Sequence, residues 1–196
     1  GTLNKYTRSF VWRCEDGAFQ LDNLTFTDGS KSYTQNFSTN SVNSMTAMGI
    51  WGVEDVRVTD ATAPTLSNGV VKMDDKDSIR FNWTKVSGAS EFSAANTYTF
   101  EFDAKVTNSG DGSTWSSSSA TRALYVAFGG WYNLVEIPTA DNKIKVCSSN
   151  SVAFSDANYL NKPLHVKIVW KGNDITATVS DANGTVVSGT RSSADF

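Results

Sequence analysis

Strict alternation of polar and apolar residues is the feature that most constrains this fold. Residues 97–106 read Thr-Tyr-Thr-Phe-Glu-Phe-Asp-Ala-Lys-Val, so every second side chain is apolar. Successive side chains of a strand point to opposite faces of a sheet, so this segment predicts a strand with one buried and one hydrated face. A long amphipathic helix would need apolar residues three and four apart, and no long stretch of the chain shows that spacing.

The same alternation recurs in short segments separated by turn residues. It is clear at residues 79–83 and 166–170, and the sequences at 172–173 and 181–184 are typical of hairpin turns. Further strands are expected at residues 9–13, 19–27, 123–128, 131–137, 143–147, 175–179 and 186–187, and a short helical turn within residues 41–52. Many short strands joined by turns predict an all-β chain, an antiparallel β-sandwich of the jelly-roll type.

Composition excludes several classes of function. A chain of 196 residues, 39% of them hydrophobic, is long enough to enclose a core and is unlike a disordered chain. Only 19% are charged and the net charge is −3, which argues against a nucleic-acid binder and against attraction to anionic lipid. No apolar run approaches the roughly 20 residues of a membrane span. We interpret the start at Gly1-Thr2 as that of a mature or trimmed chain.

The central and C-terminal strands carry a family resemblance. Residues 98–105, 124–128 and the hairpin at 164–179 resemble a concanavalin-like or laminin-G-like β-sandwich of secreted bacterial proteins. Proteins of this kind are often carbohydrate-binding modules attached to polysaccharide-degrading enzymes or cell-surface systems. The resemblance therefore implies a secreted, extracellular or cell-surface location and a place in a larger multi-domain protein.

The order of the segments differs from that of the resembling domains. Residues 10–14 and 19–28 read like a closing strand pair, yet they stand before the expected opening near residues 33–37. One hypothesis is a circularly permuted single domain, residues 1–196, in which residues 9–28 supply the last strands. The other is that residues 1–29 are the tail of a preceding repeat and residues 30–196 form the domain. We favour permutation, because a sandwich lacking two strands would expose an apolar face and bare edges.

Catalytic motifs are absent or broken. The resembling β-glucanases carry Glu-x-Asp-x-x-Glu on one strand; this chain has Glu101 and Asp103, but no second glutamate follows at Lys105 or Val106. A Ser-His-Asp triad would have to use His165, the single histidine, and no nucleophile elbow or phosphate loop is found. We therefore do not expect an enzyme.

Cofactor chemistry is equally limited. Cys14 and Cys147 lack the spacing of a zinc or redox motif, and both a bridge between them and two free thiols stay open. Three carboxylates in one turn, Asp74, Asp75 and Asp77, fit either a solvated turn or a structural calcium site. Asp22 is a second calcium candidate by position in the resembling family. We expect no other cofactor.

Aromatic residues point to a sugar site. Flat rings stack on the apolar faces of sugars, and amides and guanidinium groups bind the hydroxyls. Trp83 and Trp170 are expected in the core, whereas Trp12 and Trp51 could serve either role. The candidate ligand-binding residues are Trp115 in a long polar loop, Tyr125, Trp131 and Tyr132 for stacking, with Asn133, Arg122 and Asn82 for hydroxyl contacts.

These features favour a non-catalytic carbohydrate-binding module. We expect it to bind a neutral polysaccharide, a plant cell-wall glucan or starch, by stacking and hydrogen bonds, and to keep an enzyme or a cell on its substrate. We expect a monomer that neither binds nucleic acid nor inserts into a membrane. Two alternatives stay open: a protein-interaction or adhesin sandwich, and a glycosidase or lyase of the same fold.

Overall fold

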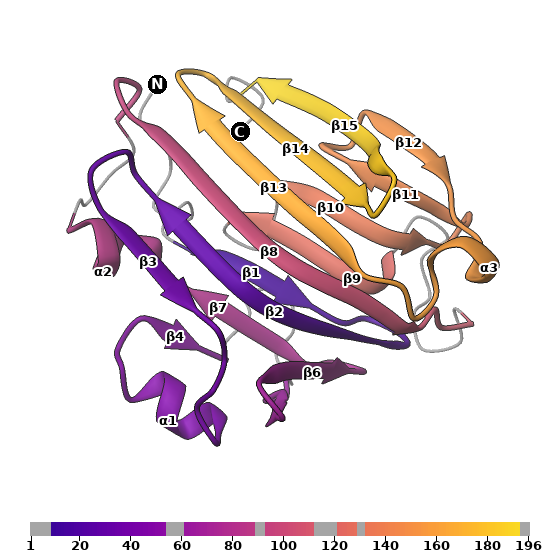
Figure 1. Ribbon diagram of the computed structural model, residues 1–196, viewed down its shortest axis with the longest axis horizontal. Helices are drawn as coiled ribbons and strands as arrows, with labels where there is room; N and C mark the ends of the chain where they lie inside the picture. The colour runs from indigo at the N-terminus through magenta and orange to yellow at the C-terminus, as the bar shows by residue number, and fades with distance from the viewer. Residues whose placement is uncertain (1–8, 54–60, 89–92, 112–120, 129–131, 193–196) are drawn as a thin grey trace.

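Two large antiparallel sheets pack against each other as a β-sandwich, which confirms the predicted fold class (Figure 1). We describe the protein from a computed structural model, for residues 9–53, 61–88, 93–111, 121–128 and 132–192. In Figure 1 the sheet that holds β2, β8, β13 and β14 lies in front of the sheet that holds β9 and β10. The described part of the chain therefore forms two layers with one core between them.

The first sheet has seven strands. In spatial order they are β12 (Asn150–Ala153), β11 (Lys143–Val146), β10 (Tyr132–Thr139), β9 (Thr121–Phe128), β1 (Phe10–Arg13), β7 (Ser78–Phe81) and β4 (Trp51–Gly52). Every pairing in it is antiparallel.

The second sheet has eight strands. Seven of them follow the order β15 (Gly184–Ser192), β14 (Asp174–Asp181), β13 (Leu164–Lys171), β8 (Thr97–Asn108), β2 (Ala18–Thr27), β6 (Val70–Asp74) and β5 (Thr65–Ser67). The eighth, β3 (Ser32–Gln35), pairs with the second half of β2. Burial alternates residue by residue along β8, as its sequence predicts.

Within the described ranges, three short helices lie between strands: α1 (Val42–Thr46), α2 (Trp83–Ser87) and α3 (Asp156–Tyr159). The helical turn expected within residues 41–52 is α1, which begins after Ser41, whose side chain accepts a hydrogen bond from the Ser44 backbone. The prediction that Trp83 continues the strand of Phe81 is wrong. Trp83 instead opens α2, and its indole is buried against Phe26. The alternation in the sequence continues to Trp83 because the side chains of Phe81 and Trp83 both point into the core.

The N-terminal segment lies at the centre of the sandwich. Strand β1 is hydrogen-bonded between β7 and β9, and β2 is hydrogen-bonded between β8 and β6. Residues 9–28 thus supply an interior strand to each sheet. This is the pairing that the hypothesis of a permuted order requires.

A tight turn carries the chain from β1 to β2, and so from one sheet to the other. The backbone amide of Asp16 donates to the Arg122 carbonyl (2.6 Å), and the Asp16 carboxylate accepts from the Asp111 amide (3.1 Å). Gly17 follows with φ +103°, and a Cβ at this position would collide with the Asn108 carbonyl. Glycine is required here both by the positive φ and by the close backbone approach.

Large aromatic side chains fill the space between the sheets. Phe10 of β1 stacks on Phe100 of β8 (centroids 4.7 Å apart) and meets Trp12, Phe102 and Phe128 edge-on. The four described tryptophans, Trp12, Trp51, Trp83 and Trp170, are at most 5% exposed. The prediction that Trp83 and Trp170 lie in the core is therefore confirmed. Trp12 and Trp51, whose roles the sequence left open, also pack in the core.

Both cysteines are free thiols. Cys14 and Cys147 are buried, and no bridge joins them. Burial raises the pKa of the Cys14 thiol, and the nearby carboxylates of Asp75 and Asp77 raise it further. Both thiols are therefore inert packing groups. Of the helices in the described ranges, none is long and apolar enough to cross a bilayer.

Candidate functional site

A row of polar residues crosses the middle of the seven-stranded sheet on its outer face, away from the core. Arg13 of β1 pairs in register with Tyr125 of β9, which pairs with Glu136 of β10. Residues that face each other in register share one side of a sheet. The core side is taken by their chain neighbours Trp12 and Val126, so these three polar side chains point outward.

Hydrogen bonds link these side chains into one network. The Tyr125 hydroxyl donates to Asn133 Oδ1 (2.6 Å), and Asn133 Nδ2 donates to Glu136 Oε1 (3.0 Å). Thr121 Oγ1 donates to the same Glu136 oxygen (3.0 Å). The guanidinium carbon of Arg13 lies 4.8 Å from the centroid of the Tyr125 ring, within the range of a cation–π contact.

Most of the network is withdrawn from solvent, and Asn133 is its partly exposed member. Arg13, Tyr125 and Thr121 are each 1% exposed and Glu136 is 4% exposed. Arg13 forms an ion pair with the buried Glu15 (Nη1 to Oε1, 3.4 Å). Burying charged and polar groups costs free energy unless each finds partners. An outer sheet face is ordinarily hydrated, so a buried polar network there marks this surface as the candidate site.

The structure brings together only some of the residues that the sequence nominates. Tyr125 and Asn133 lie in direct contact, from neighbouring strands. Arg122, at the start of β9, points elsewhere: its guanidinium donates to the Gly110 carbonyl (2.9 Å) and to the Asn142 side chain. Asn82 lies between β7 and α2 and accepts a hydrogen bond from Thr84 Oγ1 (2.7 Å).

The remaining aromatic candidates cannot be placed in the same way. Trp115 and Trp131 lie outside the described residues. The backbone of Tyr132 belongs to β10 and pairs with Phe128, but its side chain lies outside the description. Stacking by these three residues stays a prediction from the sequence.

Sequence reasoning missed Arg13, Thr121 and Glu136. Arg13 and Glu136 occupy outward-facing positions of predicted strands and are flanked by residues of the core, whereas Thr121 precedes the strand predicted at residues 123–128. Glu136 lies between Val135 and Ile137 in a predicted strand, which was the available signal. Alternation alone marks such a position as hydrated; only the pairing of β1, β9 and β10 shows that these side chains meet and are buried.

The acidic turn nominated for calcium uses its oxygens within the protein. Asp77 accepts from Thr62 Oγ1 (2.7 Å) and from the Asp74 amide (3.0 Å), and Asp75 accepts from the Gly17 amide (3.0 Å). Burial raises the pKa of Asp77. Among the described residues, no group of three or more His, Cys, Asp or Glu side chains is placed to hold a metal.

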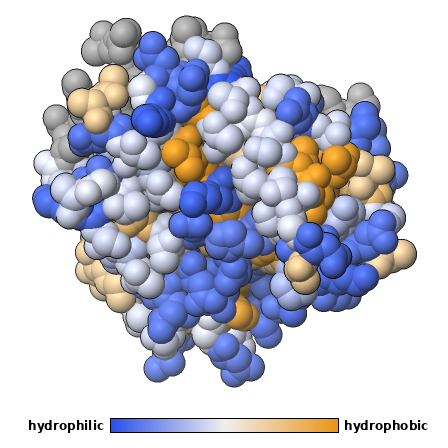
Figure 2. All heavy atoms as spheres, turned by 45° about the horizontal axis from the view of Figure 1, so that its top comes forward, coloured by the Kyte–Doolittle hydropathy of each residue, from blue (hydrophilic) through white to orange (hydrophobic). Residues whose placement is uncertain are grey.

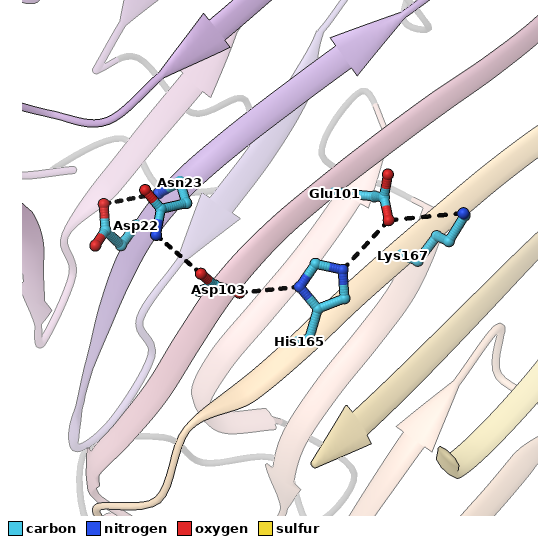
Figure 3. A network of polar contacts seen from close by, with 6 residues as sticks. All are labelled: Asp22, Asn23, Glu101, Asp103, His165 and Lys167. Atoms are coloured by element: carbon cyan, nitrogen blue, oxygen red, sulfur yellow. Dashed lines mark hydrogen bonds and ion pairs between the residues drawn. The ribbon is translucent and has the colours of Figure 1, made fainter. Parts of the chain in front are cut away.

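A second polar network lies on the outer face of the eight-stranded sheet (Figure 3). His165 of β13 contacts Asp103 through Nδ1 (2.9 Å) and Glu101 through Nε2 (3.3 Å), and Lys167 also approaches Glu101 (3.6 Å). Partial burial lowers the pKa of His165, but the hydrogen bonds to the two carboxylates outweigh it, so the pKa is raised. Glu101 and Asp103, the two acidic residues of the incomplete glucanase motif, therefore both contact His165.

The same network extends to Asp22, the second calcium candidate. Asp22 pairs in register with Asp103, and Asn23 donates from Nδ2 to Asp103 Oδ2 (2.9 Å). Partial burial raises the pKa of Asp22, and the Asp103 carboxylate adds to the rise. Asn23 adopts φ +49° at an irregularity of β2, a conformation that Asn tolerates. With His165 and Lys167 about half exposed, these are surface ion pairs of small energetic weight.

The described surface carries little apolar area. Among residues with assigned exposure, Met48 is the only large hydrophobic side chain that counts as exposed, at 47%. On the face drawn in Figure 2, hydrophilic residues cover most of the surface and hydrophobic ones show only in separate small areas. The face drawn in Figure 2 shows no broad apolar patch of the kind that marks many protein interfaces.

Comparisons with known proteins add no further assignment. No protein-family model, no curated protein and no solved structure matches this chain.

Proposed function

We propose that this protein is a non-catalytic carbohydrate-binding module for a neutral polysaccharide, such as a plant cell-wall glucan or starch. The observation that carries the proposal is the network of Tyr125, Asn133 and Glu136 on the outer face of the seven-stranded sheet. In this proposal the module belongs to a larger secreted or cell-surface protein and holds it on its substrate.

The chemistry of the network suits sugar hydroxyls. A carboxylate accepts hydrogen bonds, a side-chain amide both accepts and donates, and a phenol carries a hydroxyl beside an apolar ring. These groups are supplied by adjacent strands, which hold them at fixed spacing. Arg13, stacked over the Tyr125 ring, limits the movement of that ring.

Aromatic stacking in this proposal rests on Trp115 and Trp131. The four described tryptophans are taken up by the core. Of the six tryptophans in the chain, these two are the ones left to supply a stacking surface. Both are therefore targets of the test.

The test is affinity electrophoresis through gels that contain starch, soluble cellulose derivatives, xylan, mannan or mixed-linkage glucan. The proposal expects at least one polysaccharide to retard the wild-type protein, and Tyr125→Phe and Trp131→Ala to weaken that retardation. Tyr125→Phe removes a single hydroxyl and keeps the ring. Thr178→Ala, on the outer face of the other sheet, is the matched control and should migrate as the wild type does.

Two results would overturn the proposal. Folded wild-type protein that is retarded by none of the gels would favour the protein-interaction alternative. Release of new reducing ends or unsaturated sugars from a retarding polysaccharide would favour a glycosidase or a lyase. Trp115→Ala beside the wild type separates a loss of stacking from a loss of hydrogen bonding.

A further inference from the structure

Glu136 engages only one of its two carboxylate oxygens within the network. Its Oε1 accepts two hydrogen bonds, from Thr121 Oγ1 and from Asn133 Nδ2, both at 3.0 Å. Within the part of the chain that the structure describes, no donor lies on Oε2. Glu136 is only 4% exposed, and Oε2 is not among the buried polar atoms that lack a partner, so this oxygen keeps contact with solvent.

No cation of the described residues compensates this carboxylate. Lys145 is its cross-strand neighbour on β11, yet the two do not come within ion-pair distance. Arg13, in the same row, forms its ion pair with Glu15. Oε2 therefore remains open to a hydrogen-bond donor that approaches from solvent.

Glutamine at this position could keep Oε1 in the same two hydrogen bonds from Thr121 and Asn133. Its Nε2 would, however, place two N–H donors where the carboxylate places an acceptor. The difference between the two residues therefore lies at the second oxygen of Glu136. Charge-assisted hydrogen bonds to a carboxylate are about twice as strong as neutral ones, so a ligand donor would gain most at this atom.

We infer that Glu136 Oε2 is the acceptor for the hydroxyl groups of the bound sugar, and that Glu136 makes the site selective for neutral over acidic polysaccharides. This inference rests on the proposed function and assigns its ligand class. A neutral sugar offers hydroxyl donors to Oε2, whereas a uronate or sulfate would place a second negative charge against a buried carboxylate. The hydrogen bonds from Thr121 and Asn133 fix the position of Glu136 Oε1, and this in turn fixes the position of Oε2.

The test compares the wild type with Glu136→Gln in gels that contain a neutral glucan or its carboxymethylated form. The inference expects the wild type to bind the neutral form more tightly, and Glu136→Gln to bind it roughly tenfold or more weakly. It also expects the preference against the carboxymethylated form to shrink in Glu136→Gln. Thermal unfolding of both proteins establishes that the variant is folded, and Thr178→Ala again serves as the control.

The outcomes separate this inference from the function on which it rests. If no glucan retards the wild type, the proposed function fails, and the inference fails with it. If the wild type is retarded but Glu136→Gln binds equally well, the inference alone is overturned. If Glu136→Gln does not fold, the wild type decides: equal binding of the neutral and carboxymethylated glucans overturns the inference, and a preference for the neutral form supports it.

Discussion

Replacing Phe10 by alanine should remove a large share of the stability of this protein. Phe10 is fully buried and contacts four other rings at centroid distances from 4.7 to 6.3 Å. Truncation of a buried phenylalanine costs about 3–5 kcal/mol, and aromatic pairs add roughly 0.5–1.5 kcal/mol beyond burial. Since its partners come from both sheets, the cavity cannot close by moving one strand. We expect Phe10→Ala to lower the free energy of unfolding by about 4 kcal/mol.

The assay is equilibrium unfolding in urea, followed by tryptophan fluorescence. The urea concentration at the midpoint of unfolding should fall, while the slope of the unfolding free energy against urea concentration stays constant. The mutation changes stability but leaves the surface area exposed on unfolding almost the same. Phe10→Leu, which keeps most of the volume, is the matched control and should cost about 1 kcal/mol. A loss below about 1 kcal/mol for Phe10→Ala would refute the central position of residues 9–28.

Three further predictions concern charged groups. The raised pKa of His165 means that its contacts with Glu101 and Asp103 stabilise the fold fully below about pH 6.5 and lose this effect as the pH rises through the folded-state pKa. His165→Gln should therefore cost a few tenths of a kcal/mol in urea unfolding at pH 5.5 and less at pH 8.5; an equal cost at both would contradict this. Burial opposes ionisation of Asp28, but hydrogen bonds from the following turn, at 2.7 and 2.9 Å, prevail and lower its pKa. Asp28→Ala should cost roughly 1 kcal/mol at pH 7, and this cost should shrink as the pH falls below the ordinary aspartate pKa of about 4 and through the lowered folded-state pKa; a cost that grows on acidification would argue against it. Because the Asp77 oxygens are already hydrogen-bonded, EDTA and millimolar Ca²⁺ should give the same thermal midpoint, and a rise of several degrees with Ca²⁺ would establish a structural ion.

The sandwich could be predicted because strand alternation is local. The pattern of β8 needs no knowledge of its neighbours, and neither does the β13–β14 hairpin, where the turn and both strands are contiguous. The end of β7 shows the limit of this reasoning. Trp83 keeps the alternation in the sequence but begins a helix, since a core-facing side chain is compatible with either backbone.

The candidate site could be predicted only in part, for a topological reason. Asn133 and Tyr125 lie on two strands that follow each other in the chain, and the sequence nominates both. Arg13 and Glu136 are 123 positions apart in sequence and come into one row only because β1 lies beside β9. No local pattern encodes that pairing. Burial on an outer face is likewise a property of the assembled fold.

The sequence leaves the roles of Trp12 and Trp51 open, and the structure places both in the core. Trp12 and Trp51 lie in contact in the core, with ring centroids 6.0 Å apart. Most of the described aromatic residues pack in the core between the two sheets. An abundance of tryptophan is therefore weaker evidence for a sugar-binding surface than the sequence suggests.

The most direct test of the sugar site is hydrogen–deuterium exchange of the wild-type protein with and without soluble oligosaccharides, maltoheptaose and cellohexaose. Binding at the outer face of the seven-stranded sheet predicts slower exchange in peptides from β9 and β10 with at least one of them. Peptides from β13 and β14, on the other sheet, should exchange at unchanged rates. Protection confined to β13 and β14, or unchanged exchange with both sugars at millimolar concentration, would contradict the account.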